Sequence, residues 1–137
     1  MIKEKSCGAV VYFYKGGELL FLIEKMKLGH YSLPKGHMEN GETEEMTAIR
    51  EIKEETNLDV DLDTGFRKVI TFSPYSDCIK EVVFFVGQAR SLNFQKQEKE
   101  ISELYWLKFD DALALLTYET DQEVLFGAFE YIKKLAN

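Results

Sequence analysis

Apolar runs along the chain predict a β-sheet. Residues 5–14 (KSCGAVVYFY) would be apolar on both faces of an extended strand, which predicts a central position in the sheet. Gly16 and Gly17 separate this run from another over residues 18–25, and the two runs predict a β-hairpin. Further strands are predicted over residues 65–72, 80–90 and 103–107, with residues 73–78 as the connection between the first two.

Three other segments have the apolar spacing of helices. Residues 44–56 predict a helix with Thr43 as its N-cap. Residues 109–116 and 121–135 predict two more. The side chains expected to face inward from the first and last of these helices are Ala48, Ile49, Ile52, Val124, Ala128, Ile132 and Leu135.

These elements predict an α/β protein in which a mixed sheet is sandwiched between helices. Residues 26–42 are expected to form a loop, since they contain several glycines and a proline. No repeat, low-complexity tract or composition break divides the 137 residues, so we expect one domain over residues 1–137. Hydrophobic residues make up 45% of the chain and aromatic residues 13%, which is enough for a folded core.

The net charge and the lack of long apolar runs argue against some classes of binding partner, and the cysteine spacing argues against a cysteine metal site. A net charge of −7 argues against binding to duplex nucleic acid, which needs a basic surface. No apolar run approaches the roughly 20 residues of a membrane span, and no signal peptide is visible, so we expect no membrane partner and a cytoplasmic location. Cys7 and Cys78 lack metal-site spacing, so we expect both to be small buried apolar residues.

The helix over residues 44–56 carries the clearest candidate chemistry. Glu51, Glu54 and Glu55 are spaced i, i+3, i+4 and so lie on one narrow face. Clustered carboxylates repel each other, and binding a hard cation such as Mg²⁺ offsets that repulsion. A glutamate-rich helix face is also commonly just solvated, so spacing alone leaves both interpretations open.

The order of residues around this face is more specific. It resembles the Nudix box, whose fixed positions are matched here by Gly36, Glu42, Arg50, Glu51, Ile52, Glu54, Glu55 and Leu58. The second box glycine is replaced by Asn57, which should tolerate the left-handed geometry expected just after the helix.

The resemblance implies a Nudix fold and hydrolysis of a nucleoside diphosphate linked to another group. It implies Mg²⁺ as the cofactor, with Mn²⁺ as an alternative. The implied metal ligands are Glu51, Glu54, Glu55 and the Gly36 carbonyl. Either Glu55, which we favour, or Glu54 would be the general base. Arg50 would pair with a nearby carboxylate and orient the cluster, and Glu42 would have a structural role.

A second resemblance covers most of the chain and is to the asymmetrical diadenosine tetraphosphate hydrolases. The segments that carry it are CGAVVYF, HYSLPKGHMENGE, GFRKVITF, KEVVFFVG, ELYWLKFDDAL and TYETDQ. It implies cleavage of that dinucleotide to ATP and AMP. It also implies that Lys35 and His30 contact phosphates, that Glu100 joins the metal site, and that Tyr118 stacks on adenine.

One position of the implied site departs from the residue type that is usual in these hydrolases. The second adenine-stacking position, usually Tyr, is Phe72, and Tyr75 is a nearby alternative. Arg67 and Lys80 are further candidates for phosphate contacts. Taken singly, the aromatic residues could be packing residues, and the histidine, lysines and arginine ordinary surface residues.

Several functions compete with this one. Another Nudix hydrolase could act on RNA 5′-ends, nucleoside triphosphates or diphosphoinositol polyphosphates. A non-catalytic nucleotide-sensing domain should have lost box carboxylates, whereas this chain keeps them. A plain structural domain would have a merely solvated glutamate face. We expect a small nucleotide as the partner, and either a monomer or a homodimer.

Overall fold

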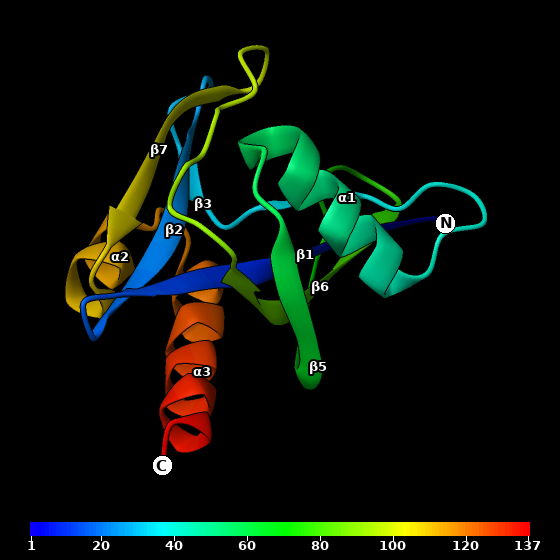
Figure 1. Cartoon of the computed structure of the whole chain (residues 1–137). Coiled ribbons are helices and arrows are strands. Elements are labelled where there is room, and N and C mark those ends of the chain that lie inside the picture. The colour runs from blue at the N-terminus through cyan, green and yellow to red at the C-terminus, as the bar shows by residue number, and fades with distance from the viewer.

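A seven-stranded mixed sheet runs through the molecule (Figure 1). The structure is a computed structural model that describes residues 1–137. The strands lie in the order β3-β2-β1-β6-β5, with β4 beside β1 and β7 beside β2. Only the β1–β6 pair is parallel. The elements are β1 (Ile2–Lys15), β2 (Glu18–Met26), β3 (Tyr31–Ser32), β4 (Lys35–His37), α1 (Glu44–Thr56), β5 (Val60–Phe72), β6 (Cys78–Ala89), β7 (Ile101–Leu107), α2 (Phe109–Leu115) and α3 (Glu119–Leu135).

The predicted central position of β1 is confirmed. The strand lies between β2 and β6 and is buried on both faces through its middle. Val10 and Tyr12 belong to one hydrophobic cluster, whereas Ala9 and Val11 belong to the other. This alternation follows from the two-residue period of a strand and places one core on each side of the sheet.

Helices cover both cores, so the predicted α/β class with a sheet between helices is confirmed. Ala48 and Ile52 of α1 are buried in one cluster. The other cluster takes its helical members from α2, α3 and the turn between them: Ala112, Leu116, Val124, Leu125, Ala128 and Ile132. In Figure 1, α1 lies above β1 and α3 below it.

Two residues predicted to face inward do not. Ile49 is 44% exposed, because the apolar residues with which α1 packs on the sheet are Ala48 and Ile52. Leu135 is also largely exposed, because it lies in the last turn of α3, beyond the end of the core at Ile132. Apolar spacing identified the helices correctly but overestimated how wide and how long their buried faces are.

Strand boundaries also differ from those predicted. The hairpin at Gly16 and Gly17 is confirmed, with Lys15 paired to Glu18. However, β5 begins at Val60 rather than at residue 65, and its pairing with β6 is irregular between Asp63 and Lys68. Aspartates in this stretch interrupt the apolar pattern. Residues 26–42 are not all loop, since they contain β3 and β4, which are too short to produce a period.

The caps predicted for α1 are confirmed. The hydroxyl of Thr43 accepts a hydrogen bond from the Met46 N–H at 3.1 Å. Asn57 adopts φ 62° and ψ 12°, the left-handed geometry, and its N–H donates to the Lys53 carbonyl at 2.9 Å. Asparagine therefore ends the helix where the box pattern has glycine.

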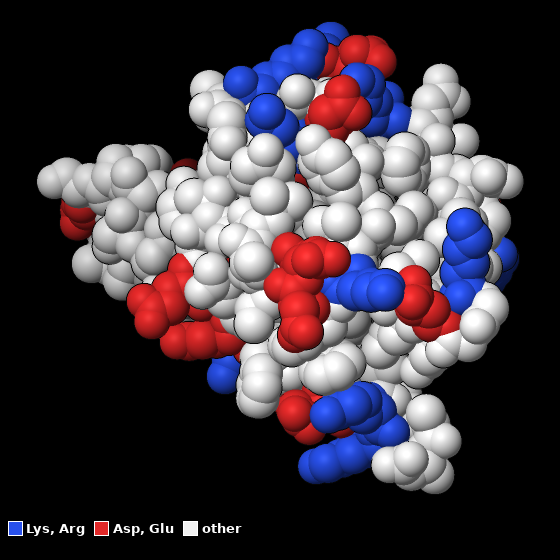
Figure 2. All heavy atoms as spheres, turned by 90° about the vertical axis from the view of Figure 1, so that its left-hand side faces the viewer, with Lys and Arg blue, Asp and Glu red and all other residues white.

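Other properties of the molecule bear on its partners. Figure 2 shows one face, on which acidic and basic side chains are interspersed among uncharged ones. No helix combines the length and the apolar character that crossing a membrane requires. Cys7 and Cys78 are free thiols and are both buried, as expected.

Candidate active site

The box glycine and the first box glutamate are in contact. β4 pairs with β1, with Gly36 opposite Cys7, and this brings the backbone of Gly36 against α1. A Cβ at position 36 would occupy the space of the Glu51 carboxyl group. Any side chain at position 36 would therefore force the Glu51 carboxylate to move from its present place.

Arg50 is the centre of a network of carboxylates. Its Nε donates to Glu42 Oε2 at 2.7 Å, and its Nη1 donates to Glu51 Oε1 at 2.8 Å and to Glu54 Oε2 at 3.2 Å. Its Nη2 donates to the His37 carbonyl at 2.8 Å. The hydrogen bond to Glu42, followed by those to the other carboxylates, raises the pKa of Arg50, so the guanidinium stays charged. One cation thus holds three box carboxylates in place.

Glu42 connects the loop to the helix. Its Oε1 accepts hydrogen bonds from the Glu39 N–H and the Thr47 hydroxyl, each at 2.9 Å. The hydrogen bond from Arg50 is the main reason that the pKa of Glu42 falls to about 2. An ionised Glu42 therefore fixes the start of α1, in line with the structural role expected for it.

A buried carboxyl pair lies beside this network. Glu55 on α1 is 4% exposed, and Glu24 on β2 is 1% exposed. Their carboxyl groups are in hydrogen-bonding contact, and Glu51 also contacts Glu55. Burial is the main cause that raises the pKa of both Glu24 and Glu55. Two neighbouring carboxylates without a cation cannot both be ionised at low cost.

Glu24 was missed by the sequence interpretation. In the sequence, its only signal is that it directly follows the apolar residues LLFLI of the predicted strand. That signal is weak, because a charged residue near the end of a strand is commonly solvated. Only the pairing of β2 with both β3 and β7 shows that Glu24 lies inside the sheet.

The carboxylates offer suitable donors for a divalent cation. Glu24 Oε1 and Glu55 Oε1 are buried and have no hydrogen-bond partner. Oxygen atoms of this kind are the ligands that Mg²⁺ and Mn²⁺ prefer. No three acidic, histidine or cysteine side chains already converge in metal-binding geometry, since Glu51 and Glu54 accept hydrogen bonds from Arg50 instead.

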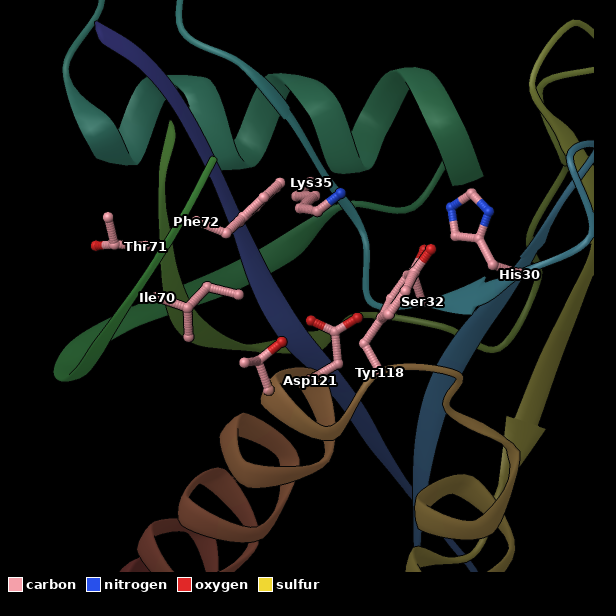
Figure 3. Close-up of a pocket in the computed structure, with 9 residues that line it drawn as sticks. His30, Ser32, Lys35, Ile70, Thr71, Phe72, Tyr118 and Asp121 are labelled. Atoms are coloured by element: carbon pink, nitrogen blue, oxygen red, sulfur yellow. The ribbon is translucent and has the colours of Figure 1, made fainter. Parts of the chain in front are cut away.

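A cavity of about 420 Å³ is lined in part by Lys35, the residue before the box glycine Gly36 (Figure 3). This volume is within the roughly 300–1,000 Å³ of typical small-molecule sites. Phe72 from β5 and Tyr118 at the start of α3 line it and are 46% and 52% exposed. Exposed rings at a cavity wall can stack on a planar ligand. The full lining is His30, Ser32, Lys35, Ile70, Thr71, Phe72, Tyr118, Thr120 and Asp121.

Lys35 connects the cavity to the carboxylates. It lines the cavity, directly precedes Gly36, and its charge acts on Glu24 and on Asp121. The His30 ring lies 5.8 Å from the Tyr118 ring, measured between centroids. Burial, and then the charge of Lys35, lower the pKa of His30, so this imidazole is neutral at pH 7.

Asp121 is a second residue that the sequence interpretation missed. It is a buried carboxylate in the first turn of α3, and Figure 3 shows it pointing into the cavity. Burial raises its pKa, and Lys35 opposes that shift. In the sequence it looks like an ordinary acidic residue near a helix N-terminus, where such residues are common.

Two of the residues predicted as candidates for substrate binding do not line the cavity. Arg67 donates two hydrogen bonds to Glu44, at 2.9 and 2.8 Å, and does not line the cavity. Tyr75 lies outside the cavity and donates to Glu4 at 3.1 Å, so Phe72 is the aromatic residue that faces Tyr118 across it.

Lys80 and Glu100 lie near the site without lining the cavity. Burial, and then the charge of Lys35, lower the pKa of Lys80. Glu100 is exposed, and its charge raises the pKa of Glu24.

The NUDIX domain model matches residues 4–127. This match covers nearly the whole chain, including the box and every residue that lines the cavity. The chain is a member of the Nudix family. Nudix hydrolases in general need divalent metal ions, and the unpartnered carboxylate oxygens described above fit that requirement.

Relatives within the Nudix family differ in what they act on. The chain is 28% identical to the pig (Sus scrofa) asymmetrical bis(5′-nucleosyl)-tetraphosphatase, over 96% of this chain and 97% of the relative. It is 34% identical to an 8-oxo-(d)GTP phosphatase of Mycolicibacterium smegmatis, over 76% of this chain but 31% of that protein. A crystal structure of a Caenorhabditis elegans Ap4A hydrolase binary complex superimposes with a TM-score of 0.82 and 26% identity, covering 93% and 98% of the two chains.

Proposed function

We propose that this Nudix hydrolase cleaves dinucleoside polyphosphates with the help of a divalent cation, and that diadenosine tetraphosphate is converted to ATP and AMP. One observation carries the proposal. Phe72 and Tyr118 line one cavity together with Lys35, whose charge acts on Glu24, the carboxyl partner of the box residue Glu55. A substrate with a flat base and a long anionic bridge matches that combination of surfaces. The low but nearly full-length similarity to asymmetrical tetraphosphatases supports the same substrate class.

The cavity would hold one adenosine. Stacking of a base on an aromatic side chain contributes about 1–3 kcal/mol. Phe72 and Tyr118 come from different elements and are both exposed at the cavity, so neither has to leave the core to bind a base. Phenylalanine in place of tyrosine keeps the stacking face and removes only a hydroxyl group.

The anionic bridge would extend from the base toward α1. Lys35 lines the cavity, directly precedes the box residue Gly36 and would bind a phosphate oxygen there. His30 would donate a hydrogen bond from its neutral ring at the cavity edge, and Lys80 adds positive charge nearby. Because one adenosine is anchored, the phosphorus that reaches the carboxylates is fixed by its distance along the bridge. Cleavage is therefore asymmetric.

Mg²⁺ or Mn²⁺ would be held by Glu51, Glu54, Glu55 and the Gly36 carbonyl, with Glu100 as an additional ligand. When bound, it neutralises phosphate oxygens and makes a water molecule more acidic. Arg50 would orient the carboxylates of Glu51 and Glu54, to which it already donates hydrogen bonds.

Glu55 would accept the proton of the attacking water. The water oxygen forms a bond to phosphorus, the bridging phosphorus–oxygen bond breaks, and ATP and AMP leave. Glu55 suits this role because its carboxylate is held in the buried cluster beside Glu24 and Glu51, whereas the side chain of Glu54 is exposed.

A chromatographic product assay with Mg²⁺ tests the proposal. The substrates are diadenosine tetraphosphate, a nucleoside triphosphate panel and a triphosphorylated RNA, each also given to Glu55→Gln. Equal amounts of ATP and AMP from the dinucleotide, lost in the variant, support the proposal. ADP as the main product, or no cleavage of the dinucleotide, contradicts it.

A nucleoside triphosphate is the second candidate substrate. The observation that favours it is the 34% identity to an 8-oxo-(d)GTP phosphatase. Faster hydrolysis of a triphosphate than of the dinucleotide in the same assay would select this candidate. That result would agree with catalysis at the box carboxylates, but it would contradict the binding of one adenosine of a dinucleotide in the cavity.

A further inference from the structure

Glu24 is a charged residue in the interior of the sheet. Its strand, β2, pairs with β3 on one side and β7 on the other, with Ser32 and Leu104 as the partners of Glu24. It is 1% exposed and forms no salt bridge, since Lys35 acts on it only through its charge. Burying a carboxylate in this way is costly unless another group compensates it.

The groups that face Glu24 are mostly carboxylates. Its carboxyl contacts that of Glu55, and the charges of Glu51 and Glu100 act on it as well. Lys35 is the one nearby positive charge that acts on it. Glu24 Oε1 and Glu55 Oε1 are both buried, and neither has a hydrogen-bond partner.

We infer that Glu24 is a further ligand of the divalent cation, contributed by the sheet rather than by the box helix. A divalent cation takes several oxygen ligands, so it can coordinate both unpartnered oxygens at once. The inference rests on the proposed function, because it assumes that the box carboxylates hold a cation. It adds to them a residue that lies outside the box, on β2.

Metal titration of Glu24→Gln without substrate tests this inference. Glutamine has the same shape and can keep a hydrogen bond to Glu55, but it lacks the charge. Binding of Mn²⁺, followed by electron paramagnetic resonance, should weaken by about tenfold or more. The matched control is Glu103→Gln on the neighbouring β7, which removes the same charge from an exposed side chain paired with Lys96. Its Mn²⁺ affinity should equal that of the wild type.

Thermal unfolding gives a second readout. A cation that binds only the folded state raises the melting temperature according to its affinity. Saturating Mg²⁺ should therefore raise the melting temperature of Glu24→Gln by less than it raises that of the wild type. In EDTA the variant should be as stable as the wild type or more so, because the two buried carboxyl groups no longer compete. If Glu24→Gln does not fold, Glu24→Asp keeps the charge, retracts the carboxylate and should still bind Mn²⁺ more weakly.

These outcomes separate the inference from the proposed function. Equal Mn²⁺ affinity for the wild type and the Glu24 variants overturns the role of Glu24 and leaves the hydrolase proposal intact. A wild type that binds no Mn²⁺ at all overturns both.

Discussion

The carboxyl group of Glu51 lies against the backbone of Gly36, in the volume that a Cβ at position 36 would occupy. Gly36→Ala should therefore displace the Glu51 carboxylate. Because that carboxylate is the end of a flexible side chain that can move aside, we expect only a small change in the free energy of unfolding, but a fall in hydrolysis of at least about tenfold. Urea unfolding and product assays measure the two effects.

The control for Gly36→Ala is Gly127→Ala. A Cβ at Gly127, inside α3, would meet only the Phe66 side chain at 3.3 Å, and alanine is the better helix former. This variant should keep its activity. Unchanged activity in Gly36→Ala would contradict the placement of Glu51 in the active site.

The buried Glu55 and the exposed Glu54 should differ when each is replaced by glutamine. Glu55→Gln should lose about 10²–10⁴-fold in kcat, as expected when a general base is removed. Its melting temperature in EDTA should not fall, because the amide no longer opposes the neighbouring Glu24 carboxyl. Glu54→Gln should also lower activity through the cation site. If only Glu54→Gln were inactive, the general base would be Glu54.

The two cavity aromatics should act on substrate binding. Phe72→Ala and Tyr118→Ala should each raise KM for the dinucleotide by roughly 10–100-fold, which corresponds to about 1–3 kcal/mol of stacking. Tyr118→Phe keeps the ring and should stay near the wild type. The control is Tyr75→Ala, because Tyr75 is exposed and lies outside the cavity. An effect of Tyr75→Ala equal to that of Phe72→Ala would argue against the cavity as the adenosine site.

The Glu44–Arg67 pair should make stability depend on pH. Hydrogen bonds from Arg67 are the main reason that the pKa of Glu44 falls from 4.5 to about 2 in the folded protein. A depressed pKa means that the stabilising effect is fully present above pH 4.5 and is lost as the pH falls toward 2. Glu44→Gln should therefore be less stable than the wild type at pH 7, and the difference should shrink at pH 3 in urea unfolding.

The control for this pH dependence is Asp61→Asn. The Asp61–Arg90 pair is fully on the surface, with an N–O distance of 2.9 Å, and such pairs contribute little. This variant should change the free energy of unfolding by less than about 0.5 kcal/mol at either pH. A Glu44→Gln difference that stays constant from pH 7 to pH 3 would contradict the ion-pair explanation.

Local sequence determined the elements and the chemistry carried by one helix. The continuous apolar run in residues 5–14 placed β1 at the centre, and Thr43 and Asn57 marked the ends of α1. These features depend on neighbours within a few residues, so the sequence contains them directly. The spacing of Glu51, Glu54 and Glu55 likewise fixes their common helix face, whatever surrounds them.

Only the tertiary structure decided what those glutamates face. Glu24 is interior because β2 lies between β3 and β7, and it meets Glu55 because α1 packs on the sheet. Phe72, Tyr118 and Asp121 share one cavity because the end of β5 approaches the start of α3. Glu24 and Glu55, like Phe72 and Tyr118, are far apart along the chain. They come together because helices pack on both faces of one sheet, and the local spacing of apolar residues carries no information about that packing.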